Sequence, residues 1–223
     1  MKRRIASVAI VVAIGAIAVV VGAAFGSWAW GADEEPSAVM TTEEVESPPV
    51  CARSERVSWQ KLANEIRAPV YCPSWLPSPL VGQFGGRFFN GRSVDPDRSY
   101  LVSFVWFERS FGVVNEVHVN LRGYPGTTRI PTCEDTLTVA GKTVRTKIPC
   151  FSDKRGTKRI GGTTVTAYTA NQGADQWHVL YAWRRNGTLY TLSEHVAEPY
   201  GVEEVISHLD RMMRRLVLVP PSA

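Results

Sequence analysis

Four histidines are the residues of this chain best suited to acid–base or metal chemistry. His118 and His178 lie in segments whose alternating polarity predicts β-strands, so their side chains can meet on one face of a sheet. Beside Glu116 or Glu194, they could bind a metal ion or act as a base. Histidines on the polar faces of strands are most often surface residues, and the other two histidines belong to no catalytic motif. We therefore assign no catalytic residue and no metal ligand.

Other short motifs that carry chemistry are incomplete. The Gly-Lys-Thr run at 141–143 matches the end of a phosphate-binding P-loop, but Thr136 stands where that loop requires glycine. Asp95 and Asp97 flank Pro96 in a predicted turn, so we interpret them as turn residues and not as a catalytic carboxylate pair. The sequence contains neither a Gly-x-Ser-x-Gly elbow nor a His-Glu-x-x-His pair. It thus predicts a protein that is not an enzyme and that has no cofactor.

An apolar run near the N terminus indicates where the protein works. Residues 5–25 carry no charge, follow three cations at 2–4, and span roughly 31 Å as a helix, which is about the thickness of a bilayer's hydrocarbon core. By the positive-inside rule, we predict a cytoplasmic stub at 1–4, a single transmembrane helix at 5–28, and everything beyond it outside the cell membrane. Cleavage as a signal peptide stays an alternative, because 27–29 form a passable cleavage site.

The rest of the chain divides by composition into a tether and a folded domain. Residues 29–50 hold six acidic residues, three prolines and no Lys or Arg, so they cannot bury enough apolar surface to fold. We expect a disordered acidic tether there. Residues 51–223 hold five of the seven Trp and all seven Tyr, which is enough for the core of one extracytoplasmic domain.

All four cysteines, Cys51, Cys72, Cys133 and Cys150, lie in that outer domain. An even number of cysteines in an oxidising compartment predicts two disulfides, and three pairings are open. We prefer Cys51–Cys72 with Cys133–Cys150, because each bond then closes a short loop. We reject a zinc site, since the sequence has no Cys-x-x-Cys and no histidine near a cysteine.

The outer domain is basic, and much of its excess charge lies between residues 142 and 159. It holds 22 Lys and Arg against 15 Asp and Glu, a net charge of +7. We expect Lys154, Arg155, Lys158 and Arg159 to bind an anionic envelope component or an acidic protein. The alternative is a solvated hairpin surface. We expect no nucleic acid partner, because the domain is predicted to face away from the cytoplasm.

Two helices and a run of strands are expected to position these residues. Apolar spacing predicts helices over 59–66 and 202–216, and the prolines of 69–79 predict an extended segment without a hydrogen-bonded ladder. Asn186-Gly187 is the predicted turn of the last hairpin. The fold class is α+β: an antiparallel sheet of about six to seven strands, with an N-terminal and a C-terminal helix packed on it. The strands are expected at 100–108, 116–121, 137–139, 143–148, 162–169, 177–183 and 189–193.

Two segments of the outer domain resemble a known kind of domain. Residues 68–77, Ala-Pro-Val-Tyr-Cys-Pro-Ser-Trp-Leu-Pro, resemble its opening, and residues 183–216 resemble its closing hairpin and helix. The domain occurs outside the membrane in bacterial membrane-anchored proteins, including some anti-sigma-type regulators. The resemblance implies a non-catalytic envelope module. With only residues 1–4 expected in the cytoplasm, a sigma-binding role is not expected.

These features leave three functions. The first, which we favour, is a membrane-anchored extracytoplasmic binding or sensory module without catalytic activity. The second is an envelope lipid or ligand carrier, with a cleft between sheet and helices walled by Trp177, Tyr181 and Trp183. The third is a small extracytoplasmic hydrolase. An open apolar cavity would favour the carrier. Converging histidines and acids would favour the hydrolase, and a filled core with a basic face would favour the binding module.

Overall fold

The computed structural model describes residues 47–80, 87–110, 112–139, 142–170, 175 and 177–222. The predicted anchor and nearly all of the predicted acidic tether lie outside these residues. Among the helices that are described, none is long and apolar enough to cross a membrane. Residues 46–223 form one compact unit, and every described helix and strand belongs to it.

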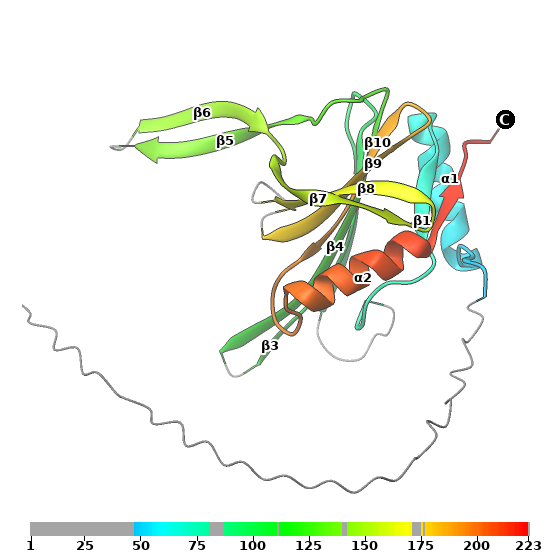
Figure 1. Ribbon diagram of the computed structural model, residues 1–223, viewed down its shortest axis with the longest axis horizontal. Helices are drawn as coiled ribbons and strands as arrows, with labels where there is room; N and C mark the ends of the chain where they lie inside the picture. The colour runs from blue at the N-terminus through cyan, green and yellow to red at the C-terminus, as the bar shows by residue number, and fades with distance from the viewer. Residues whose placement is uncertain are drawn as a thin grey trace, which may run out of the picture. The chain divides into compact units, whose positions relative to one another are not determined.

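The largest element is an antiparallel sheet of seven strands (Figure 1). Neighbouring strands are consecutive in the chain except at the centre, where the last hairpin comes to lie against the third strand of the sheet. That hairpin turns at Asn186 and Gly187, both with positive φ (50° and 73°), as predicted. In spatial order the strands are β2 (Arg87–Val94), β3 (Tyr100–Ser110), β4 (Val113–Pro125), β10 (Thr188–His195), β9 (His178–Arg185), β8 (Thr163–Ala170) and β7 (Asp153–Ile160).

Two further pairs of strands lie outside this sheet. β5 (Thr132–Val139) and β6 (Lys142–Pro149) form a hairpin that projects from it, and β1 (Val70–Pro73) pairs with β11 (Leu216–Val219) (Figure 1). Cys133 of β5 is bonded to Cys150, directly after β6, and Cys72 of β1 is bonded to Cys51. These are the two disulfides that the sequence analysis preferred.

Both helices pack into one core with the same face of the sheet. α1 (Arg53–Ile66) and α2 (Val202–Arg214) bury apolar positions predicted from their spacing. Because successive residues of a strand point to opposite faces, this core takes alternate residues of the central strands: Val119, Leu121, Val179, Tyr181, Tyr190 and Leu192. A smaller cluster around Phe151, Leu180 and Leu189 covers part of the opposite face. The seven-stranded antiparallel sheet with two helices is consistent with the predicted α+β class.

Several boundaries differ from the sequence prediction. The Pro-rich segment does form a ladder, because Val70–Pro73 finds its partner in Leu216–Val219 at the far end of the chain. The C-terminal helix therefore ends at Arg214 instead of continuing to 216. β2, β7 and β11 were not predicted as strands. Trp177 precedes β9 with a positive φ of 61° and is 64% exposed, so it does not share the inward face of that strand.

Candidate functional site

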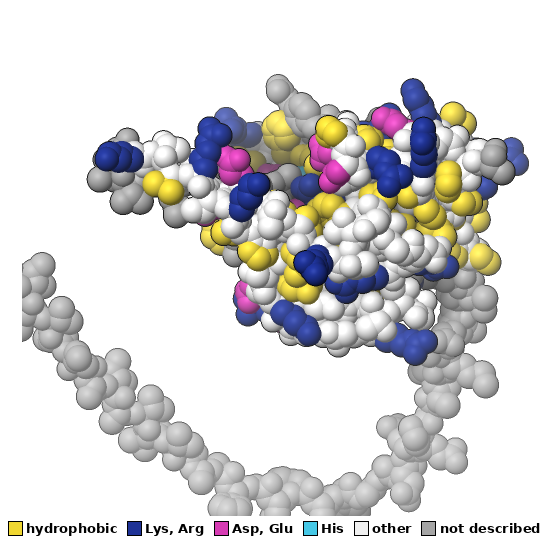
Figure 2. All heavy atoms as spheres, turned by 90° about the horizontal axis from the view of Figure 1, so that it is seen from above, with side chains coloured by type: hydrophobic (Ala, Val, Ile, Leu, Met, Phe, Trp, Pro, Cys, Tyr) yellow, Lys and Arg dark blue, Asp and Glu magenta, His cyan; other side chains and the backbone are white. Residues whose placement is uncertain are grey.

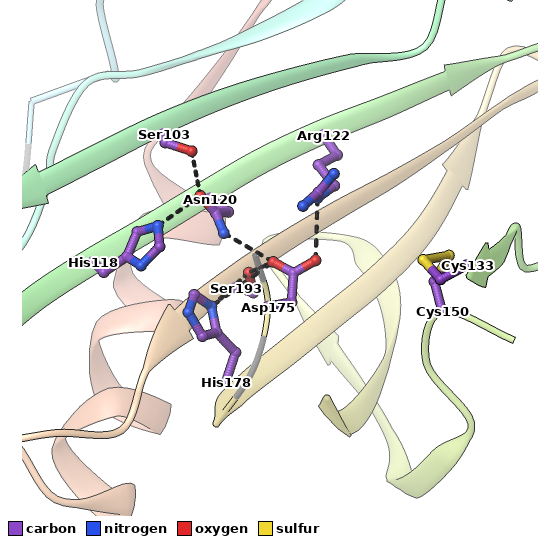
Figure 3. A network of polar contacts seen from close by, with 9 residues as sticks. All are labelled: Ser103, His118, Asn120, Arg122, Cys133, Cys150, Asp175, His178 and Ser193. Carbon is purple, nitrogen blue, oxygen red and sulfur yellow. Dashed lines mark hydrogen bonds and ion pairs between the residues drawn. A yellow bond between two sulfur atoms is a disulfide. The ribbon is translucent and has the colours of Figure 1, made fainter. Parts of the chain in front are cut away.

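A network of polar side chains lies on the sheet face opposite the helices, and Figure 3 shows it from close by. β4 contributes residues 116, 118, 120 and 122, which alternate with the core residues Val117, Val119 and Leu121. The strands β3, β10 and β9 add one residue each, and Asp175 comes from the connection between β8 and β9 (Figure 3). Those strand residues are Ser103 of β3, Ser193 of β10 and His178 of β9.

Asp175 is the centre of this network. Its Oδ1 accepts hydrogen bonds from Asn120 Nδ2 at 2.9 Å and from Ser193 Oγ at 2.8 Å. Its Oδ2 lies 3.1 Å from Nε of Arg122 as an ion pair. Asn120 Oδ1 accepts a further hydrogen bond from Ser103 Oγ at 2.6 Å. The buried carboxylate is thus compensated by one cation and two donors, which is the condition for burying a charge without a large penalty.

His178 is joined to the same network through Ser193. Its Nδ1 lies 3.0 Å from Ser193 Oγ. Because that hydroxyl donates its only proton to Asp175, we assign the imidazole proton to Nδ1, which then donates to Ser193. Nε2 is left as a buried acceptor without a hydrogen-bond partner. Burial, together with the neighbouring histidines His118 and His195, lowers the pKa of His178 to about 2, so His178 stays neutral.

Ser193, His178 and Asp175 are the residue types of a hydrolytic triad, but they do not have its geometry. In a triad the imidazole accepts the serine proton while its other nitrogen is held by the carboxylate. Here Asp175 accepts the serine proton directly, and the same nitrogen of His178 faces both partners, 3.8 Å from Asp175 Oδ1. The side chain of His178 is only 1% exposed. This arrangement fixes Asp175 in place and does not activate Ser193.

The two histidines singled out in the sequence do meet. The ring centroids of His118 and His178 lie 4.9 Å apart, and His195, which is opposite His178 in the β9–β10 register, lies 5.2 Å from it. Glu116 Oε1 lies 3.3 Å from Nδ1 of His118. Within the described part of the chain, however, no three His, Cys, Asp or Glu side chains are arranged to hold a metal ion.

Glu194, the other predicted neighbour of these histidines, lies on the helix side of the sheet instead. It is fully buried, and its Oε1 lies 2.8 Å from Nδ1 of His208 on α2. Burial raises the pKa of Glu194, and the contact with His208 opposes that effect. The pair connects α2 to β10.

A groove of about 600 Å³ lies between α2 and the strands β7, β8 and β9. Its apolar wall includes Val179 and Ala167 of the sheet and Val202 and Ile206 of α2. Val202 and Ile206 belong to the predicted apolar stripe of α2, yet they are 52% and 37% exposed. The groove therefore presents apolar surface to solvent beside polar residues of β7.

The structure separates the four cations that were predicted to bind an anion. All four lie on β7, an edge strand, where charged side chains also hinder pairing with other chains. Arg155 and Lys158 line the groove, whereas Lys154 and Arg159 are not among its lining residues. Elsewhere the face in Figure 2 carries scattered Lys and Arg side chains rather than one basic patch. Only half of the predicted set therefore shares a site.

Only one of the three aromatic residues predicted to wall a cleft does so. Tyr181 lines the groove. Trp183 is buried in the core and stacks on Tyr190 with ring centroids 5.6 Å apart, and Trp177 is exposed outside the strand.

The roles of Asp175, Arg122 and Ser193 were not predicted from the sequence. Asp175 lies in a connection, and its partners come from β4 and β10, which become neighbours only in the folded sheet. The one usable signal was the unbroken polar alternation of β4 from residue 116 to residue 122, which indicates a second polar face.

Comparisons with protein-family models, curated proteins and solved structures give no significant match to this chain.

Proposed function

We propose that residues 51–223 form an extracytoplasmic binding module without catalytic activity, held at the cell membrane by residues 5–28. The observation that supports this proposal is the groove between α2 and β7–β9, because two cations accompany its apolar wall and distinguish it from the purely apolar cavity that would favour a carrier. Sites of this kind bind small ligands through apolar contact and orient them with a few polar groups.

The polar network supports the non-catalytic part of the proposal. Its hydrogen bonds join β3, β4 and β10 to the β8–β9 connection, and the hydroxyl of Ser193 is already donated to Asp175. Hydrogen bonds of this kind between strands and a connection hold the side chains of the network in fixed positions. Ser103 donates its hydroxyl proton to Asn120 and Ser193 donates its own to Asp175, so neither hydroxyl is paired with an unprotonated imidazole nitrogen.

A ligand carrier in the envelope is the second candidate. The exposed apolar side chains of Val202 and Ile206 favour it, because a ligand with an apolar part would shield them from water. A carrier and a sensory module share this binding site and differ in what happens after binding.

Native mass spectrometry after exposure to an envelope extract tests the proposal. Residues 46–223 are suitable, since they contain both described cores and both disulfides. We expect a non-covalently bound small molecule on the wild type and not on Ala167→Phe, which fills the groove. Thr138→Phe, at an exposed position of the β5–β6 hairpin, is the matched control. The absence of a bound molecule on the wild type, or binding unaffected by Ala167→Phe, contradicts the proposal.

A further inference from the structure

We infer that the groove takes a single-chain amphiphile with an anionic head, its head at Arg155 and Lys158 and its chain against Val202 and Ile206. This inference rests on the proposed function and names the ligand class of the same site.

The apolar part of the groove points to a hydrocarbon chain. α2 buries Val205, Leu209, Met212 and Met213 against the sheet, while Val202 and Ile206 of the same helix stay exposed over the groove. Val179 of β9 provides buried apolar surface on the opposite wall. A chain lying between helix and sheet would remove the exposed surface of Val202 and Ile206 from water, which is the main source of affinity for apolar ligands.

The polar part of the groove points to an anion. Lys158 Nζ lies 4.7 Å from the centroid of the Tyr181 ring and 2.5 Å from Asp210 Oδ1. Arg155 Nη2 lies 2.6 Å from Asp153 Oδ2, and its Nε donates to Thr169 Oγ1 at 3.2 Å. All these charged side chains are partly exposed. Ion pairs of that kind are weak, so an anionic head can replace either acid at little cost.

The combination narrows the ligand class. A small inorganic anion would leave the apolar wall in water, and an uncharged chain would gain no charge contact with Arg155 or Lys158. A guanidinium and an ammonium together suit a carboxylate or a phosphate head, and the guanidinium offers further donors in a planar fork. The volume of about 600 Å³ lies within the ordinary range of small-ligand sites.

Titration calorimetry on residues 46–223 with four probes tests the inference. Dodecanoate and dodecyl phosphate carry both parts of the ligand, dodecanol carries only the chain, and acetate carries only the head. We expect both anionic amphiphiles to bind roughly tenfold more tightly than dodecanol, since two partly exposed charge contacts together are worth about one decade in affinity, and more tightly still than acetate, which lacks the chain. The tighter of the two identifies the head as carboxylate or phosphate.

Paired variants locate the contacts. Arg155→Gln with Lys158→Gln should weaken dodecanoate binding roughly tenfold and leave dodecanol unchanged. Lys154→Gln with Arg159→Gln removes the same charge from the same strand but outside the groove, and should change binding little. Ile206→Ser should weaken the binding of all three chain-bearing probes, whereas Val144→Ser on the hairpin should weaken the binding of none of them.

Two outcomes overturn the inference. One is dodecanol binding as tightly as dodecanoate, and the other is an equal loss from both pairs of charge variants. If no amphiphile binds while native mass spectrometry still shows a molecule in the groove, the ligand class is wrong and the proposed function stands. If neither experiment shows a bound molecule, both are wrong.

Discussion

Nζ of Lys158 and Oδ1 of Asp210 lie 2.5 Å apart, so that an ion pair joins the edge strand β7 to helix α2. The same oxygen of Asp210 accepts a hydrogen bond from the hydroxyl of Tyr181 at 2.7 Å. Three elements that enclose the groove, β7, β9 and α2, therefore meet at one carboxylate. In the proposed binding mode, this carboxylate competes with the ligand head for Lys158.

Asp210→Asn is expected to tighten dodecanoate binding by up to about fivefold, because it removes the competing charge while its amide oxygen still accepts from Tyr181. The free energy of unfolding should fall by less than about 1 kcal/mol, since the ion pair is partly exposed. Calorimetry and urea unfolding measure the two effects. Glu203→Gln, an exposed position of the same helix, is the control for the change in net charge. Weaker binding by Asp210→Asn would contradict the competition.

Acid should destabilise the domain through His178. Its folded pKa of about 2 lies below its ordinary value of 6.5. Between these two pH values, His178 is therefore protonated in the unfolded chain and neutral in the folded chain. The stability that His178 contributes is present above pH 6.5 and is lost as the pH falls, by about 2 kcal/mol at pH 5. Burial also lowers the pKa of His118, which adds in the same direction.

The comparison with His178→Gln isolates this effect. The raised pKa of buried Glu194 makes acid stabilising, but this contribution is the same in the wild type and the variant and cancels in the comparison. Between pH 7 and pH 5, urea unfolding should show the variant losing about 2 kcal/mol less than the wild type. An identical pH dependence of the two proteins would show that His178 takes up a proton in the folded state.

Gly123 is expected to tolerate no side chain. A Cβ at this position would overlap the ring of Tyr100, which is its buried partner in the β3–β4 register. Gly123→Ala should therefore lower the free energy of unfolding by about 1–3 kcal/mol through overpacking. Gly91→Ala on β2 is the matched control, since a Cβ there meets no atom, and it should not destabilise. Equal effects of the two substitutions would refute the close approach of Tyr100.

The two disulfides should stabilise different parts of the domain. Replacing Cys51 and Cys72 by alanine removes a buried bond beside the main core and should cost about 3 kcal/mol, a fall of roughly 6–12 °C in Tm. Replacing Cys133 and Cys150 should mainly expose the β5–β6 hairpin to proteolysis, because the hairpin pairs with no strand of the large sheet. Scanning calorimetry and limited proteolysis distinguish the two. If a protease cut the variant without Cys133 and Cys150 in α1 before it cut the hairpin, this prediction would be wrong.

Local rules predicted the parts of this fold that depend on nearby residues. The apolar stripes of both helices, the polar alternation of β4 and the Asn186-Gly187 turn follow from periodicity and backbone preference. The preferred cysteine pairing also holds, since each bond closes a loop within one part of the chain.

The parts that were missed depend on contacts between distant segments. β1 is a strand only because β11 reaches it from the end of the chain, which overrides the weak strand preference of a Pro-rich segment. β7 lacks apolar alternation because an edge strand has little to bury, and only its Ile160 is buried. Val202 and Ile206 of α2 line the groove and stay exposed, although their apolar spacing suggests burial against the sheet.

Methyl NMR of residues 46–223 during a titration with dodecanoate tests most directly whether the groove is the ligand site. We expect saturable shifts in the methyl signals of Val179, Val202 and Ile206, which line the groove, and none at Val144 on the hairpin. Shifts confined to Leu180 and Leu189, which face the other side of the sheet, would contradict this, as would the absence of any saturable shift.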